Sequence, residues 1–68
     1  MPSYYVNDHA QANGDHEVHV ATCFWYQRAQ SCTYVGEHAS CYTAVLAAKQ
    51  KYWQSNGCAT CSPACNTG

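Results

Sequence analysis

Six cysteines in a 68-residue chain with almost no large aliphatic side chains limit how this sequence can fold. Leu46 is the only leucine, isoleucine is absent, and the apolar content comes mainly from alanine, valine, tyrosine, tryptophan and cysteine. A chain of this length buries only about 60% of the surface that it exposes when unfolded. Such a core rarely stabilises a fold alone, so we expect the cysteines to supply cross-links, either as disulfides or through a metal ion.

The compartment in which the protein resides decides between disulfides and metal ligands. The chain starts Met-Pro-Ser-Tyr-Tyr-Val, which lacks the basic start and the apolar run of a signal peptide. No segment approaches the roughly 20 apolar residues of a membrane span. If the chain is the full product, these features predict a cytoplasmic protein whose thiols are reduced and whose closely spaced cysteines bind metal.

The charged residues predict neither a nucleic-acid partner nor a membrane surface. Only Arg28, Lys49 and Lys51 are cationic, and they stand against four acidic residues, for a formal net charge of −1. Three scattered cations cannot neutralise a run of phosphates. They also do not form the polybasic cluster that binds anionic lipids.

The first half of the chain predicts three short strands. Residues 3–7 are rich in tyrosine and valine, and residues 17–21 alternate in polarity, so we expect a hairpin across the Asn13-Gly14-Asp15 turn. Residues 23–31 are expected to be irregular and aromatic. A third strand is predicted at residues 33–35 and is expected to stop at Gly36.

The second half predicts one helix over residues 41–54, with Ser40 as N-cap and Gly57 near its C-terminal cap. Its predicted apolar stripe consists of Cys41, Ala44, Val45, Ala48 and Tyr52. A short turn is expected to begin at Ser62-Pro63. The predicted fold is thus one α+β domain over residues 1–68, with about three antiparallel strands packed on one helix and a C-terminal CxxC knuckle.

Three further residues of the predicted helix, Tyr42, Leu46 and Trp53, lie outside the core stripe. They can pack against the aromatic segment Phe24-Trp25-Tyr26. They can instead form, with Trp25, an exposed aromatic surface that contacts a protein partner or a second copy of the chain.

Cys58-x-x-Cys61 is the strongest local motif. Two thiolates at this spacing can reach one tetrahedral zinc ion. A CxxC pair also occurs in redox proteins, but there it opens a helix, which lowers the pKa of the thiol. Here the pair follows a predicted helix, which favours a metal site.

The other half of the site is predicted at His19-x-x-x-Cys23, where a histidine near a strand end precedes a cysteine in the next turn. The predicted ligands for Zn²⁺ are therefore His19, Cys23, Cys58 and Cys61, a closed structural set. Two alternatives stay open. His19 can lie on the solvent face of its strand, and Cys65 can replace it to give an all-cysteine site.

The order of these features resembles a known family: His19-x-x-x-Cys23, a Tyr34-Val35 strand, a helix after Ser40, and Gly57-Cys58-x-x-Cys61. It is similar to the zinc-binding domain of Ada-type DNA methylphosphotriester repair proteins, especially small Ada-like modules that pair a histidine with a cysteine in the first knuckle. It is also similar to short bacterial proteins with an Asn-Gly-Asp-His-Glu-Val-His segment and three closely spaced terminal cysteines.

This resemblance covers roughly residues 13–65 and implies zinc bound by His19, Cys23, Cys58 and Cys61. It does not imply the repair activity. In the family, a cysteine of the first knuckle accepts the methyl group, and His19 occupies the first position of that knuckle here. The basic surface that would bind DNA is also missing.

Cys32, Cys41 and Cys65 remain outside this set. Cys41 is expected to be a reduced core thiol, or to form a disulfide with Cys65 in an oxidising setting, and Cys32 is expected to be exposed. No catalytic residue is predicted. Three roles follow: an interaction module with a structural zinc, which we favour; an enzyme or thiol-reactive metal protein; and a secreted, disulfide-stapled peptide.

Overall fold

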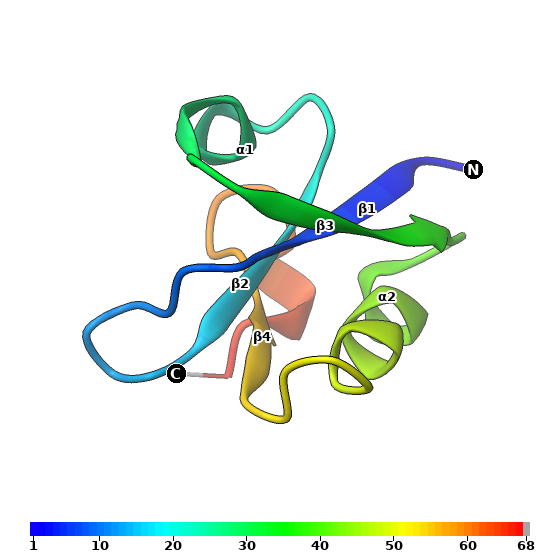
Figure 1. Cartoon of the computed structure of the whole chain (residues 1–68). Helices are drawn as coiled ribbons and strands as arrows, with labels where there is room; N and C mark the ends of the chain where they lie inside the picture. The colour runs from blue at the N-terminus through cyan, green and yellow to red at the C-terminus, as the bar shows by residue number, and fades with distance from the viewer. Residues whose placement is uncertain (68) are drawn as a thin grey trace.

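The computed structural model describes residues 1–67, which form a four-stranded sheet flanked by short helices (Figure 1). The elements in chain order are β1 (Ser3–Asn7), β2 (His16–Val20), α1 (Phe24–Arg28), β3 (Cys32–Glu37), α2 (Cys41–Ala48), β4 (Ser55–Gly57) and the 3-10 turn η1 (Pro63–Cys65). The α+β class is as predicted, but the structure has one more strand and one more helix than expected.

The sheet has the order β3-β1-β2-β4. β1 pairs antiparallel with β2 in the predicted hairpin, where Tyr5 lies opposite His19, and it pairs antiparallel with β3 on its other edge. β4 pairs in parallel with β2, so the sheet is mixed. The three predicted strands are therefore present, and the fourth is a correction to the predicted sheet.

One face of the sheet packs against α2. Alternate residues of β1 and β2 point to this face, and Val6 and Val18 are completely buried there. Ala44 and Ala48 of α2 are also completely buried, because their small side chains let the helix lie close to the sheet. The predicted apolar stripe is confirmed for the four residues that lie in α2: Cys41 is buried as well, and Val45 packs at the margin of the core. Tyr52 also packs there, but it lies beyond the end of the helix.

The predicted helix is too long at its C-terminal end. α2 ends at Ala48, and Ser40 occupies the N-cap position without a side-chain capping hydrogen bond. Residues 49–54 favour helix by propensity, but Tyr52 turns back to stack on His16, with ring centroids 3.9 Å apart. The chain can then enter β4, so Gly57 lies in a strand and does not cap the helix.

Two further local predictions are wrong. The segment expected to be irregular contains α1, whose Tyr26 packs on Tyr5 with ring centroids 4.5 Å apart. Gly36 does not stop the third strand. It lies inside β3 with a φ of +105°, opposite Tyr4, where the register with β1 shifts by a bulge.

The side chains outside the core stripe do not pack against the aromatic segment. Tyr42 is 61%, Leu46 is 62% and Trp53 is 84% exposed, so the alternative in which they are covered within the chain is wrong. Trp25 is half-exposed on α1. Within residues 1–67, no helix has the combination of length and apolar character that crossing a membrane requires.

Candidate metal centre

The first two predicted ligands come from the end of β2 and the turn that follows it. Val18 of β2 faces α2, so its neighbour His19 points to the opposite face of the sheet. After Val20 the chain turns, and the amide of Cys23 donates a hydrogen bond of 3.1 Å to the carbonyl of Val20. This turn brings Cys23 back over the face on which His19 lies.

The other two ligands are positioned by β4. The amide of Cys58 donates a hydrogen bond of 3.0 Å to the carbonyl of Val18, which extends the parallel pairing and places Cys58 beside His19. The amide of Ser62 then donates to the carbonyl of Cys58 at 2.8 Å and closes a turn that contains Cys61. The CxxC motif therefore follows a strand, which corrects the prediction that it follows a helix directly.

The structure brings all four predicted ligands together. One nitrogen of His19 and the three sulfurs of Cys23, Cys58 and Cys61 lie within 4.8 Å of one another. His19 Nδ1 lies 3.6 Å from the sulfur of Cys23 and 3.9 Å from that of Cys61. The sulfurs of Cys23 and Cys58 are 4.0 Å apart.

Three of these separations are close to those of a tetrahedral zinc site. With Zn–S bonds of about 2.3 Å and a Zn–N bond of about 2.05 Å, a tetrahedron places two sulfurs about 3.8 Å apart and a sulfur and nitrogen about 3.6 Å apart. The distances from His19 to Cys23 and Cys61, and from Cys23 to Cys58, exceed these values by no more than a few tenths of an ångström. The cluster can thus hold a metal ion.

His19 is 1% exposed, so the alternative that it lies on the solvent face is wrong. Its Nε2 atom faces a carboxylate oxygen of Glu17 at 3.7 Å. A proton on Nε2 is favoured by this carboxylate and leaves the lone pair of Nδ1 for the metal. Glu17 was not predicted to have a role, although two residues that are two positions apart on a strand share one face.

The protonation of the cluster also fits a cation site. Burial lowers the pKa of His19, against the opposing effect of Glu17, so the imidazole is neutral at neutral pH. Burial raises the pKa of Cys61 to about 12. Burial alone would raise the pKa of Cys23. Hydrogen bonds from Cys61 and from the amides of Tyr26 and Trp25 have the larger combined effect, so the pKa of Cys23 is lowered.

Cys41 and Cys65 form a disulfide. Cys65 is thus not a ligand, and the alternative all-cysteine site is wrong. The expectation that Cys41 is a reduced core thiol is also wrong, whereas the disulfide proposed for an oxidising setting is present. Cys32 is a free, half-exposed thiol. Cys23, Cys58 and Cys61 are also not in disulfides, so the alternative with three disulfides is not what the structure shows.

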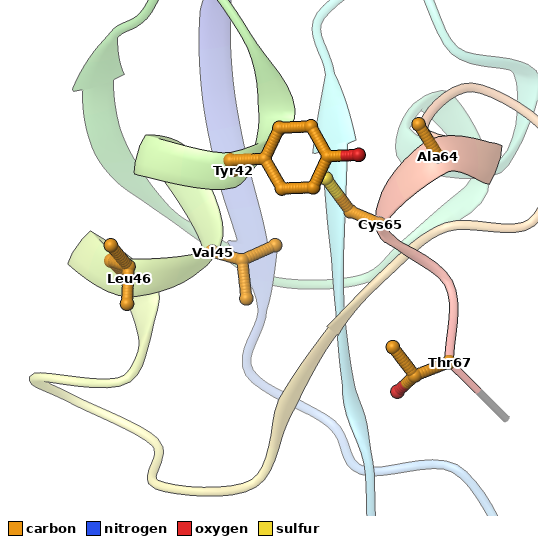
Figure 2. A pocket seen from close by; sticks show the side chains of 6 residues that line it. All are labelled: Tyr42, Val45, Leu46, Ala64, Cys65 and Thr67. Carbon is orange, nitrogen blue, oxygen red and sulfur yellow. The ribbon is translucent and has the colours of Figure 1, made fainter.

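A groove of about 290 Å³ lies between α2 and η1 (Figure 2). Its lining is mostly apolar and consists of Tyr42, Val45, Leu46, Ala64, Cys65 and Thr67. Of the side chains predicted to form an exposed aromatic surface, Tyr42 and Leu46 line this groove, and Trp53 does not. Trp25 instead lies beside the cluster, where its indole N–H donates a hydrogen bond of 3.1 Å to Thr60, between Cys58 and Cys61.

Comparison of the chain with protein-family models, curated proteins and solved structures finds no match. The resemblance to Ada-like domains therefore stays a prediction made from the order of the ligands.

Proposed function

We propose that this chain is a zinc-binding domain whose metal ion is structural and whose exposed aromatic side chains contact a protein partner. The observation that carries the proposal is the set of four ligand atoms that all lie within 4.8 Å of one another. Three thiolates and one imidazole favour zinc over harder cations such as Mg²⁺ and Ca²⁺.

A structural role is favoured over a catalytic one by the number of protein ligands. Catalytic zinc sites use three protein ligands and keep a position for water or substrate, whereas structural sites are closed by four. Three of the four residues are buried and Cys61 is half-buried, which leaves little access for a substrate. The enzyme alternative predicts instead that one of the four residues can be replaced without loss of the metal.

The interaction role is supported by exposure alone. Trp25, Tyr42 and Trp53 are each at least half-exposed, although tryptophan and tyrosine are large apolar residues that such a small core would use. Aromatic residues of this kind are enriched at the centres of protein interfaces. They lie on different elements, so the partner or second copy that they would contact stays a proposal.

Native mass spectrometry tests the metal. We expect a mass excess of one zinc ion per chain, lost on acidification together with the folded charge-state distribution, because the metal contributes to the folding free energy. Substitution by Co²⁺ should give sulfur-to-cobalt charge-transfer bands and tetrahedral d–d bands. A folded chain with no bound metal, purified without chelators, would contradict the proposal.

The compartment needs its own test. Disulfides are rare in cytosolic proteins, and the Cys41–Cys65 disulfide favours an oxidising compartment over the predicted cytoplasm. Thiol counting on protein trapped by alkylation in the intact cell decides between them. Six alkylated cysteines after denaturation indicate a reducing compartment, and four indicate that the disulfide forms in the cell.

A further inference from the structure

The C-terminal segment that contains η1 lies directly against the strand that presents Cys58. The amide side chain of Asn66 donates a hydrogen bond of 2.9 Å to the carbonyl of Gly57. The amide of Thr67 donates to the side chain of Asn56 at 3.1 Å. The contact at Gly57 is close enough that an added Cβ atom would lie 2.6 Å from the Cβ of Cys65.

The same segment closes the turn around the metal ligands. Ser62 is 3% exposed, and its amide bonds the carbonyl of Cys58 while its carbonyl accepts from the amide of Cys65 at 3.0 Å. The Cys41–Cys65 disulfide ties this turn to α2. Cys58 and Cys61 are thus held between a paired strand and a turn that is covalently fixed to the helix.

The Cys65 half of the disulfide borders the groove between α2 and η1, whereas Cys41 does not line it, and both residues are largely buried. Cys65 lines this groove, and Figure 2 shows its sulfur pointing from η1 toward α2. Cys41 is the first residue of α2, where the positive end of the helix dipole stabilises a thiolate. Attack by an external thiolate is therefore favoured at the sulfur of Cys65. The thiolate can approach this sulfur from the groove, and the bond that breaks releases Cys41, which is the better leaving group.

We propose that Cys41–Cys65 is a thiol–disulfide exchange site that controls the affinity of the metal centre. A thiolate of a dithiol reductant attacks Cys65, forms a mixed disulfide and expels the Cys41 thiolate, which takes up a proton. The second thiol of the reductant then displaces Cys65, so the reductant leaves as a disulfide and both cysteines are reduced. This inference rests on the metal binding proposed above.

The expected effect comes from preorganisation. While the disulfide is intact, the turn around Cys58 and Cys61 is ordered before the metal binds, and after reduction that ordering must occur on binding. Loss of comparable supporting contacts lowers metal affinity about 10–100-fold, and we expect a decrease in this range. By reciprocity, bound metal should make the disulfide harder to reduce, by about 30 mV for each tenfold change in affinity.

Zinc affinity measured against a chromophoric chelator tests this inference. The oxidised protein is compared with the same protein after reduction by a phosphine and with the variant carrying both Cys41→Ala and Cys65→Ala. We expect both to bind zinc 10–100-fold more weakly than the oxidised protein, as in the range above. The matched control, Cys32→Ser, keeps the disulfide and should retain the affinity of the oxidised wild type.

A second variant guards against simple unfolding of the reduced domain. Asn66→Ala leaves the disulfide in place but removes the bond to Gly57, and it should weaken zinc binding in the same direction. Equal zinc affinity in the oxidised, reduced and Asn66→Ala proteins would overturn the exchange site and leave the metal centre standing. Absence of zinc binding even in the oxidised protein would overturn both proposals.

Discussion

At the scale of single residues, the metal centre depends on side chains that have few other roles. His19 is a polar side chain buried on a sheet face, and such burial is unfavourable unless the polar atoms have partners. Its two nitrogens face the cysteine sulfurs on one side and Glu17 on the other. Each of these contacts can be removed separately by substitution.

Cys58→Ser should abolish the metal-supported fold, because serine is a poor zinc ligand and the remaining three groups cannot close the site. Loss of a residue that only orients a metal ligand lowers metal affinity by up to roughly 100-fold. We expect the loss of a ligand itself to lower zinc affinity by more than that. Competition with a chelator and far-UV circular dichroism measure the two effects. Cys32→Ser is the matched control and should be nearly silent, so equal damage in both variants would mean that the ligand set is wrong.

Glu17→Gln should lower zinc affinity about tenfold while the fold is retained at saturating zinc. The neutral amide still fits beside His19, but it no longer stabilises the proton on Nε2. Isothermal titration measures the change, and Glu37→Gln, which removes an exposed acidic group of β3, serves as the control. The positioning role of Glu17 is contradicted if the two variants bind zinc equally well.

At the scale of elements, β4 and η1 approach each other closely at Gly57. At Gly57 an added Cβ would also lie 2.8 Å from the carbonyl oxygen of Ser62 and 2.9 Å from the carbonyl carbon of Cys65. These are backbone atoms of a turn that is held by a disulfide, so they cannot move away easily. The absence of a side chain at this position permits the approach.

Gly57→Ala should therefore destabilise the domain by about 3 kcal/mol, at the upper end of the cost of overpacking. It should also weaken zinc binding, because the turn that carries Cys61 is displaced. Urea unfolding of the zinc-loaded protein measures the stability. Ala64→Ser, an exposed change in η1, is expected to have little effect, and unchanged stability of the alanine variant would show that η1 can shift freely.

A second junction between elements centres on Asp8, just after β1. Its carboxylate accepts hydrogen bonds of 2.6 Å from Ser31, 2.6 Å from Thr33 and 2.8 Å from Tyr52. The bonds from Ser31 and Thr33 are the main favourable interactions that hold the pKa of Asp8 well below its usual value, with Lys51 contributing less. The carboxylate thus joins the start of β3 to the segment after α2.

Asp8→Asn should reduce stability by about 2 kcal/mol at pH 7, because hydrogen bonds to a charged group are lost. The pKa of Asp8 is lower in the folded than in the unfolded state, so its contribution is present above about pH 4 and is lost as the pH falls toward the folded-state pKa. Urea unfolding of both proteins at each pH should show a difference that shrinks below pH 4. A difference independent of pH would contradict this assignment.

At the scale of the whole molecule, the disulfide and the candidate metal site lie on opposite faces of one sheet. The disulfide belongs to the core between the sheet and α2, and the four-residue cluster lies on the face toward which His19 points. Such staples replace the aliphatic core that the composition lacks. The two tryptophans report on different parts of this arrangement.

Removal of the metal should change the fluorescence of Trp25 but not that of Trp53. Trp25 is bonded to Thr60 in the turn between the ligands, whereas Trp53 is 84% exposed already. With Trp53→Phe, a chelator should shift the emission to longer wavelength and increase quenching by acrylamide. With Trp25→Phe, both should stay nearly constant, and a comparable shift in the two variants would contradict the placement of Trp25.

Features that depend on local spacing could be predicted from the sequence. Alternating polarity predicted the hairpin of β1 and β2, the apolar stripe predicted the buried face of α2, and two short motifs predicted the pairs His19–Cys23 and Cys58–Cys61. Each of these rests on residues a few positions apart, whereas joining the two pairs into one site rested on the four ligands that a structural zinc ion requires.

The way in which distant segments meet could not be predicted from local patterns. The end of α2 at Ala48, the parallel pairing of β4 with β2 and the pairing of Cys41 with Cys65 all depend on contacts across many residues. Residues 49–54 favour helix locally, by roughly a few tenths of a kcal/mol per residue. The contacts of Tyr52 and the pairing of Ser55–Gly57 outweigh that preference. Local propensity is weak next to packing in a domain that has so little core.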